Sequence, residues 1–214
     1  MKVNDDLPQI SIILPTIGRP EGLKRCLDSI SKLNYPEENI EIIVIEDKPR
    51  IGVPQRMVEG VKRSTGEYIV YASNDMEFEP NCILRALRHK EALIAFNAGP
   101  VLPDEGNICE HFIFRKDFLP KVGGEIFCTE FNHVGVDNLL WEKCKILNEA
   151  VWCREAKVIH YHYSRTGEPM DEIYLLAWDK QLVREDRLLL IKKMKEINRE
   201  PKWLNTIKKM TNQV

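Results

Sequence analysis

Apolar residues in the first hundred positions form short continuous runs that are separated by stripes at helical spacing. The runs lie at residues 10–14, 40–45, 68–72 and 93–98. Each is as long as a strand and is rich in β-branched or aromatic residues, which is typical of strands buried on both faces. The helical stripes lie at residues 23–33, 53–64 and 80–90. Strands that alternate with helices in this way predict an α/β fold with a parallel sheet.

The second half of the chain carries weaker patterns of the same kind. Alternation predicts strands at 108–115 and 151–163, and helical spacing predicts a helix at 136–146. Beyond Pro169 the pattern is helical and basic, with an interruption at Pro201. We therefore expect one α/β domain that is followed by a helical segment.

Three predicted strands end in segments rich in side-chain oxygen atoms. These segments are 15–19, 46–47 and 73–75. The carboxyl ends of parallel strands meet at one edge of a sheet, where α/β proteins bind ligands. A turn is the alternative interpretation of Asn74 and Asp75, because both side chains hydrogen-bond their own backbone.

A nucleotide at this edge would need a source of positive charge. No GxGxxG loop and no P-loop follows the first predicted strand. A divalent cation would supply the charge, and the carboxylate of Asp75 suits Mg²⁺ or Mn²⁺, which prefer hard oxygen ligands.

Charge is distributed unevenly along a chain whose formal net charge is only −2. This balance gives no reason to expect a nucleic-acid partner. Residues 179–214 contain ten Lys and Arg against five Asp and Glu, so this segment carries +5 and the first 178 residues carry −7. The basic segment is either the solvated face of packed helices or an amphipathic element on an anionic membrane. The apolar residues that raise the second interpretation are Leu188, Leu189, Leu190, Ile191, Trp203, Leu204 and Ile207.

The six cysteines form no CxxC pair and lie mostly among apolar residues. They are therefore expected to be reduced, as in cytosolic proteins. Residues 1–7 are polar, and no apolar run approaches the length of a membrane span. We expect a cytoplasmic protein.

Three segments of the first half follow one another in the order ISIILPTIGRPEGLKRCLDSI, IEIIVIEDKP and GVKRSTGEYIVYASNDMEFEP. In this order they resemble the nucleotide-binding half of family 2 glycosyltransferases, a family of inverting enzymes of GT-A fold. FRKDFLPKVGG, VGVDNLLWEKC and AKVIHYHYS are similar to its acceptor-side glycines, its ED motif and its late histidine. The resemblance covers about residues 8–165. It implies a Rossmann-like, mostly parallel sheet flanked by helices, with a nucleotide-binding half at 1–98 and an acceptor half at 99–178. The helical and basic pattern adds an extension at 179–214.

The resemblance also implies roles for residues on the nucleotide side. Pro15 and Thr16 would lie against the base, and Asp47 would bind the base or the ribose. Arg19 and Arg56 are further candidates for contact with the diphosphate.

The family's metal motif, DxD, falls on Ser73, Asn74 and Asp75, so a serine occupies the place of the first aspartate. Asp75 would then be the main protein ligand, with Asn74 against the nucleotide sugar. His160 matches the family's metal-associated histidine, although a histidine at a strand end often only packs or caps. A zinc site formed by His160 and His162 is the alternative. The remaining histidines, His89, His111 and His133, are interpreted as structural or surface residues.

Asp137 matches the second acid of the ED motif, whereas the first position is Val136. The resemblance implies that Asp137 is the catalytic base. Its alternative role is an acid at a helix N-terminus, stabilised by the helix dipole. Glu125 and Glu130 are substitute candidates for the base.

The sequence thus predicts a glycosyltransferase that uses a nucleotide-diphosphate sugar and a divalent cation. The acceptor would be a glycan, a lipid-linked glycan or a protein, and a lipid-linked acceptor would place the chain at a membrane surface. A sugar-phosphate nucleotidyltransferase is one alternative, although it normally opens with a glycine-rich phosphate loop. A non-catalytic module that binds nucleotide sugars is the other, favoured by the departures at Ser73 and Val136.

Overall fold

A computed structural model describes residues 7–99, 109–167 and 169–212. The strands are β1 (Ile10–Thr16), β2 (Ile40–Glu46), β3 (Tyr68–Tyr71), β4 (Met76–Phe78), β5 (Leu93–Asn97), β6 (Phe112–Arg115) and β7 (Ala150–His160). The helices are α1 (Pro20–Ile30), α2 (Val53–Arg63), α3 (Cys82–Ala86), α4 (Val136–Ile146), α5 (Tyr163–Thr166), α6 (Glu172–Ala177), α7 (Lys180–Glu196) and α8 (Trp203–Asn212). Two 3₁₀ segments are η1 (Glu37–Asn39) and η2 (Lys116–Val122).

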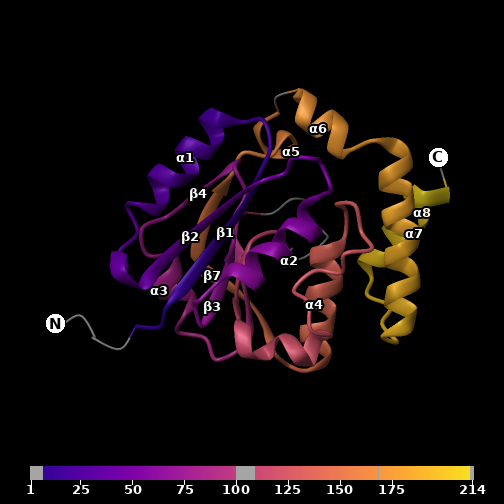
Figure 1. Cartoon of the computed structure of the whole chain (residues 1–214). Coiled ribbons are helices and arrows are strands. Elements are labelled where there is room, and N and C mark those ends of the chain that lie inside the picture. Colours follow the sequence, from indigo (N-terminus) through magenta and orange to yellow (C-terminus); the bar gives the residue numbers. More distant parts are fainter. Residues whose placement is uncertain (1–6, 100–108, 168, 213–214) are drawn as a thin grey trace.

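Within the described residues the strands form a seven-stranded sheet in the order β2-β1-β3-β6-β5-β7-β4. Figure 1 shows the strands between flanking helices such as α1 and α4. β1 pairs in parallel with β2 and β3, and β5 pairs in parallel with β7. β6 is antiparallel to β3 and β5, and β4 is antiparallel to β7. Five strands therefore run in one direction and two in the other. The predicted mostly parallel α/β sheet flanked by helices is confirmed.

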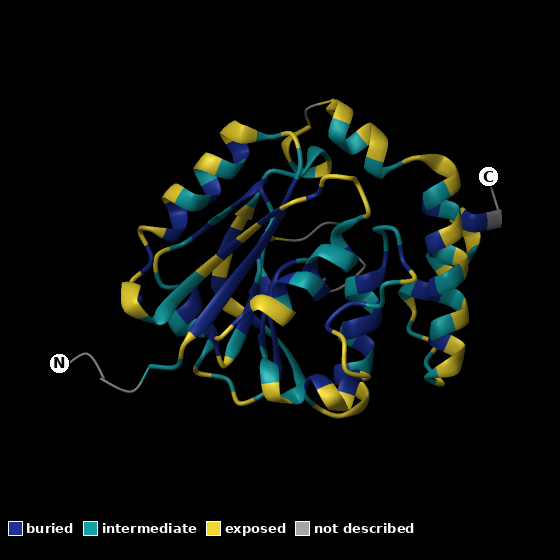
Figure 2. Ribbon diagram, viewed as in Figure 1, coloured by how far each residue is buried: buried dark blue, intermediate teal, exposed yellow. Residues whose placement is uncertain are grey.

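Helices cover both faces of the sheet, which explains why its strands read as continuous apolar runs. In β1, Ile10, Ile12 and Leu14 pack with α1 and α3, whereas Ile13 faces the opposite layer with α2, α4 and α7. Figure 2 shows the buried residues along the strands and on the inner sides of the helices. Each fully buried isoleucine or leucine contributes about 1.5–3 kcal/mol of hydrophobic stabilisation.

The C-terminal helices α7 and α8 share this second layer. Leu190, Met194 and Leu204 are buried in the same apolar cluster as Leu139 and Leu140 of α4. The apolar side of the basic segment thus packs inward. The division of the chain at residue 178 stays a prediction.

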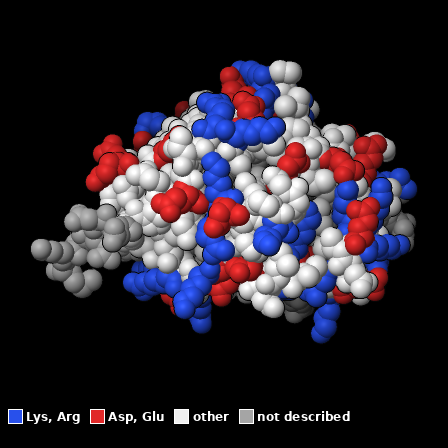
Figure 3. All heavy atoms as spheres, turned by 60° about the horizontal axis from the view of Figure 1, so that its bottom comes forward, with Lys and Arg blue, Asp and Glu red and all other residues white. Residues whose placement is uncertain are grey.

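The charged side of the C-terminal segment carries paired charges. Lys193 contacts Glu130 and Glu196, and Lys208 lies 3.5 Å from Glu200. Figure 3 shows Lys and Arg interspersed with Asp and Glu over the face that it presents. This arrangement agrees with the solvated-face interpretation of the basic segment. In the part of the chain that the structure describes, no helix has the length and apolar character needed to cross a membrane.

Some predicted elements are shorter in the structure. The helix expected at 80–90 is limited to Cys82–Ala86, because no apolar residue continues the stripe over 88–91. Of the strand expected at 108–115, only Phe112–Arg115 forms, and residue 108 lies outside the described residues. The strand expected at 151–163 ends at His160, and the short helix α5 begins at Tyr163.

A close approach of α1 to the loop after β3 fixes the edge of the sheet. Gly22 is buried in the first turn of α1. A Cβ atom at this position would lie 2.2 Å from the backbone oxygen of Asn74. Only a residue without a side chain lets the helix contact this loop.

We expect Gly22→Ala to destabilise the fold by about 1–3 kcal/mol, because either the helix or the 74–75 loop must move to admit the methyl group. The change can be measured as the free energy of unfolding in urea. Lys24→Ala, at an exposed position in the same helix, is the control. Equal stability of the two variants would contradict the close approach.

Candidate active site

A cavity of about 480 Å³ lies at the carboxyl ends of β1, β2 and β3. The strand ends contribute Pro15, Thr16, Arg19, Asp47, Asn74 and Asp75 to its lining. The part of the chain after β5 contributes Glu110, His111, the segment 132–138 and His160, and the α6 region contributes Tyr174 and Trp178. The three oxygen-rich segments predicted to meet at one edge of the sheet do so.

Hydrogen bonds join these three segments to one another. The backbone N–H of Asp47 donates to the backbone oxygen of Thr16 at 2.8 Å. Nδ2 of Asn74 donates to Oγ1 of Thr16 at 2.9 Å. Asn74 is therefore more than an isolated turn residue, because it ties the end of β3 to the end of β1.

Asp47 organises its own loop as well as lining the cavity. Its carboxylate accepts from the backbone N–H groups of Ile51 and Gly52, at 3.0 and 3.1 Å, and from Nε of Arg56 at 2.9 Å. Arg56 is absent from the lining of the cavity among the described residues, whereas Arg50 lies in it. Of these two predicted site residues, Asp47 lines the cavity, whereas Arg56 lies outside the lining and hydrogen-bonds the carboxylate of Asp47.

Arg19 contacts α6 more closely than it contacts the sheet. Its guanidinium makes two 2.7 Å hydrogen bonds to the carboxylate of Asp171 and lies 3.5 Å from Asp75. The same group stacks over the ring of Tyr174, 4.0 Å from the ring centroid. Arg19 is thereby held at the cavity wall.

Asp75 is the most heavily contacted carboxylate of the site. Ser73 donates to Oδ1 at 2.5 Å, Nε2 of His160 lies 3.4 Å from Oδ1, and the hydroxyl of Tyr174 donates to Oδ2. Burial by itself would raise the pKa of Asp75. The hydrogen bonds from His160, Ser73 and Tyr174 outweigh burial and hold this pKa well below its usual range.

The pairing of β4 with β7 explains how His160 reaches Asp75. These strands are antiparallel, with Met76 opposite His160, so residue 75 lies next to the histidine. Behind the ring, Nδ1 of His160 is 3.2 Å from Glu110, which accepts a 2.7 Å hydrogen bond from Arg165. Nη1 of Arg165 also lies 2.7 Å from this Nδ1.

His111 joins the same group, although the sequence indicated only a structural or surface role. It is 2% exposed, and its Nε2 lies 2.8 Å from Oγ of Ser73. Its ring stacks on Tyr71 and meets the edge of His160, with centroids 5.5 and 4.6 Å away. Burial, followed by the nearby His160, lowers the pKa of His111 to about 3, so the ring is neutral at physiological pH.

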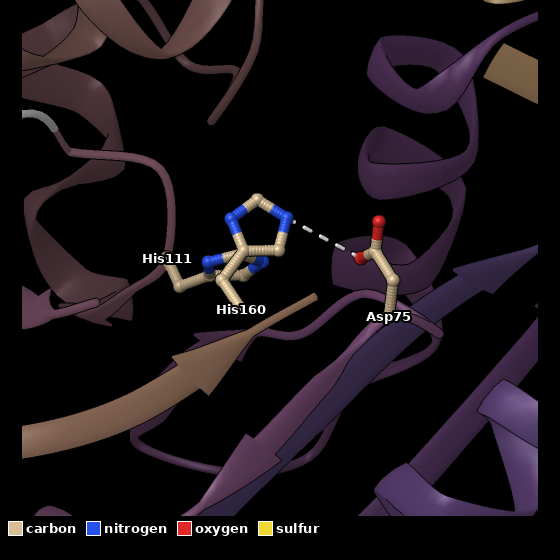
Figure 4. Close-up of side chains that lie close together, drawn as sticks. All are labelled: Asp75, His111 and His160. Atoms are coloured by element: carbon tan, nitrogen blue, oxygen red, sulfur yellow. Dashed lines mark ion pairs between the residues drawn. The ribbon is translucent and has the colours of Figure 1, made fainter. Parts of the chain in front are cut away.

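Asp75, His111 and His160 together satisfy the requirements of a cation site. One potential ligand atom from each lies within 4.8 Å of the others (Figure 4). Nδ1 of His111 is buried without a hydrogen-bond partner in the described part of the chain. One carboxylate and two imidazoles form a mixed donor set: carboxylates suit Mg²⁺ and Mn²⁺, and imidazoles suit Zn²⁺ and Fe²⁺. Glu110 behind His160 is the kind of carboxylate that orients a ligating histidine. The residues therefore fit a divalent cation.

His162 is part of a different arrangement. Its Nδ1 lies 2.7 Å from Oγ of Ser164 and accepts from the backbone N–H of Ser164, so it caps α5. Its ring packs with those of Tyr163 and Tyr174. Among the residues described, the possible ligand cluster includes His160 and omits His162, which disfavours a zinc site formed by the His160–His162 pair.

Asp137 lies at the start of α4 and faces the cavity. Its carboxylate accepts from the backbone N–H of Asn138 at 2.9 Å. Protein atoms surround most of the group, and this burial, together with the nearby Glu110, raises the pKa of Asp137 to about 7. Val136 beside it is a buried core residue. Glu125 and Glu130 are exposed and do not belong to the cavity lining of the described chain.

No protein-family model and no curated protein sequence matches this chain. Solved structures do match it. A mannosyltransferase from Pyrobaculum calidifontis, in complex with GDP-Man and Mn²⁺, superposes with a TM-score of 0.68 at 15% identity, over 92% of this chain and 66% of that one. TarS 1–349 from S. aureus superposes with a TM-score of 0.58 at 13% identity, over 91% and 74%. The same protein in complex with UDP-GlcNAc gives 0.57 at 13% identity, over 84% and 66%.

These likenesses show the fold. The chain has the GT-A-type fold of glycosyltransferases, and it spans about two thirds of the mannosyltransferase and 39% of a longer TarS chain.

We expect His111→Asn to weaken the binding of Mn²⁺ at least tenfold, because it removes one of three ligands. The affinity can be measured by titration calorimetry with the metal alone. His89→Asn, at a partly exposed histidine outside the cavity lining, is the control. Unchanged affinity in His111→Asn would exclude His111 from the cation site.

A second prediction concerns the pH dependence of stability. The raised pKa of Asp137 means that the folded protein keeps a proton that the unfolded chain releases above pH about 3.8. The contribution of this group is therefore most favourable at low pH and is lost as the pH rises towards about 7. Between pH 5 and 7 the loss amounts to about 2–3 kcal/mol.

Asp137→Asn should remove this dependence. The free energy of unfolding of the variant minus that of the parent should increase by the same amount between pH 5 and 8, measured in urea. A pH-independent difference would show that Asp137 titrates normally.

Proposed function

We propose that this chain is a family 2 glycosyltransferase that moves a sugar from a nucleotide-diphosphate sugar to an acceptor hydroxyl with inversion. One observation carries the proposal: a cluster that could hold a divalent cation and a carboxyl group with a pKa of about 7 face the same cavity of a GT-A-type fold. The mannosyltransferase and TarS structures were solved with GDP-Man and UDP-GlcNAc respectively, which supports a nucleotide sugar as donor.

Each end of the cavity suits one part of the donor. Pro15, Thr16 and Asp47 would contact the base and ribose at the ends of β1 and β2. Arg19 and Arg50 would lie near the diphosphate, where fixed positive charge is needed. Asn74, buried beside Thr16, would contact the nucleotide sugar.

Asp75, His111 and His160 would hold Mn²⁺ or Mg²⁺, with Ser73 fixing two of them instead of binding directly. The cation, when bound, would neutralise charge on the diphosphate. The hydroxyl of Tyr174 donates a hydrogen bond to Oδ2 of Asp75, and this bond would have to break before a cation could bind that oxygen.

Asp137 would act as the general base. As the acceptor oxygen forms its bond to the anomeric carbon, the bond from this carbon to the diphosphate breaks, and its electron pair leaves with the diphosphate. The hydroxyl proton passes to the carboxylate of Asp137. A base with a pKa near 7 is half ionised at neutral pH and still basic enough to accept this proton. No covalent intermediate is needed, which accounts for inversion.

A non-catalytic module that binds nucleotide sugars is the second candidate. Tyr174 and Arg19 both contact Oδ2 of Asp75, so side chains of the protein already occupy an oxygen atom that a catalytic cation would need. Such a module would bind donor and Mn²⁺ without consuming the donor. Measuring both binding and slow hydrolysis of nucleotide sugars separates the two functions.

The acceptor would be a glycan, a lipid-linked glycan or a protein, and a cytoplasmic protein that contacts the membrane peripherally would suit the second of these. Exposed apolar residues that favour such contact include Leu188 of the C-terminal segment, which is 45% exposed, and Leu175 and Leu176 of α6, which are 60% and 51% exposed. Leu176 also lines the cavity.

We expect Asp137→Asn to bind donor and Mn²⁺ normally and to transfer sugar at least about a hundredfold more slowly, because the amide keeps the shape and loses the basicity. Single-turnover transfer from a radiolabelled nucleotide sugar measures the rate. Asp117→Asn, at an exposed carboxylate outside the cavity lining, is the matched control. Near-parental transfer by Asp137→Asn would exclude this residue as the base.

A further inference from the structure

A buried aspartate of α7 organises the loop that precedes Asp137. Asp186 is 1% exposed. Its Oδ1 accepts from the backbone N–H of Asn132 at 2.8 Å, and its Oδ2 accepts from those of His133 and Val134, both at 2.7 Å. Nδ2 of Asn132 adds a fourth hydrogen bond at 3.1 Å.

The loop at 132–134 leads directly into the candidate base. Residues 132–138 all line the cavity. Gly135 follows the loop with a φ of 85° and caps the start of α4. A Cβ atom at Gly135 would lie 2.7 Å from Cδ2 of Leu190, which follows Asp186 by one turn of α7. One face of α7 thus holds both the loop and the turn before Asp137.

The opposite side of the loop contacts the nucleotide-binding half. Just before the loop, Nε2 of Gln55 donates to the backbone oxygen of Thr129 at 2.9 Å. A Cβ atom at Gly52 would lie 2.6 Å from the backbone oxygen of Asn132. The loop is therefore clamped between α7 and the 47–52 segment that Asp47 organises.

The chemistry of the loop requires an anion at position 186. Three backbone N–H groups converge on one side chain, and such a nest of donors stabilises negative charge. A carboxylate accepts all of them with charge-assisted bonds. Asparagine has the same shape, but its NH₂ group would face a donor instead of accepting from it.

We propose that Asp186 is a positioning residue that fixes the 132–134 loop and thereby places Asp137 in the cavity. The helix α7 is then part of the catalytic unit. This inference rests on the proposed function for its effect on catalysis, whereas the effect on the loop is independent of it.

The test compares Asp186→Asn and the milder Asp186→Glu with Arg199→Met. Arg199 follows α7 and makes two hydrogen bonds, of 3.0 and 2.8 Å, to the fully buried Glu142 of α4. Its replacement weakens the same interface without touching the 132–134 loop. All variants are studied at a temperature at which circular dichroism shows them folded.

We expect Asp186→Asn to accelerate hydrogen exchange of the His133 and Val134 amides at least tenfold. We also expect kcat to fall by about tenfold to a hundredfold while the donor dissociation constant changes less than threefold. Asp186→Glu keeps the charge but displaces it, and should show smaller changes in the same direction. Arg199→Met should leave both the loop exchange and kcat at parental values.

The outcomes separate the two proposals. Parental loop exchange in Asp186→Asn and Asp186→Glu, or an equal loss of kcat in Arg199→Met, would overturn the positioning role. If loop exchange is faster in Asp186→Asn but the parent protein transfers no sugar from any nucleotide sugar, the role in the loop is supported and the proposed function is refuted.

Discussion

The antiparallel pairings of two short strands determine which side chains lie together at the cavity. β6 is inserted beside β3, with Phe112 opposite Tyr71, and this register brings His111 next to Ser73. β4 pairs with the end of β7 and brings His160 next to Asp75. A purely parallel sheet would gather only the ends of β1, β2 and β3. The pairings of these two reversed strands bring imidazole nitrogen atoms to an edge that otherwise offers oxygen atoms.

The departure at Ser73 has a physical explanation in these contacts. Its hydroxyl donates to Asp75 and lies within hydrogen-bonding distance of His111, so it links the carboxylate to the added imidazole. A second carboxylate at this position would place two negative charges close together in a buried site, which is costly. The chain has an uncharged side chain at this position, with the neutral imidazole of His111 beside it. Val136 is a buried core residue, so Asp137 is the acidic side chain in the first turn of α4.

Much of the fold follows from the sequence because its signals are local. The strands β1, β2, β3 and β5 and the helices α1, α2 and α4 come from apolar periodicity, and the meeting of Thr16, Asp47 and Asp75 follows from parallel topology. The position of His111 does not, since a register between strands that are distant in the chain decides it. The role of Arg56 is equally non-local, because only the structure shows that Asp47 turns its carboxylate towards this side chain.

The C-terminal segment has a pattern of buried positions that its net charge does not indicate. Its net positive charge suggests an appendage, yet the buried positions of α7 are Val183, Asp186, Leu190 and Met194, at spacings of three, four and four. This is the stripe of a helix that packs against a core, and one member of it is a carboxylate. A charge in such a stripe must have buried donors as partners, because an unpaired carboxylate there would cost far more than the helix gains from packing. The partners are the backbone amides of the 132–134 loop, so the energetic requirement of one side chain connects the last helices of the chain to the wall of the cavity.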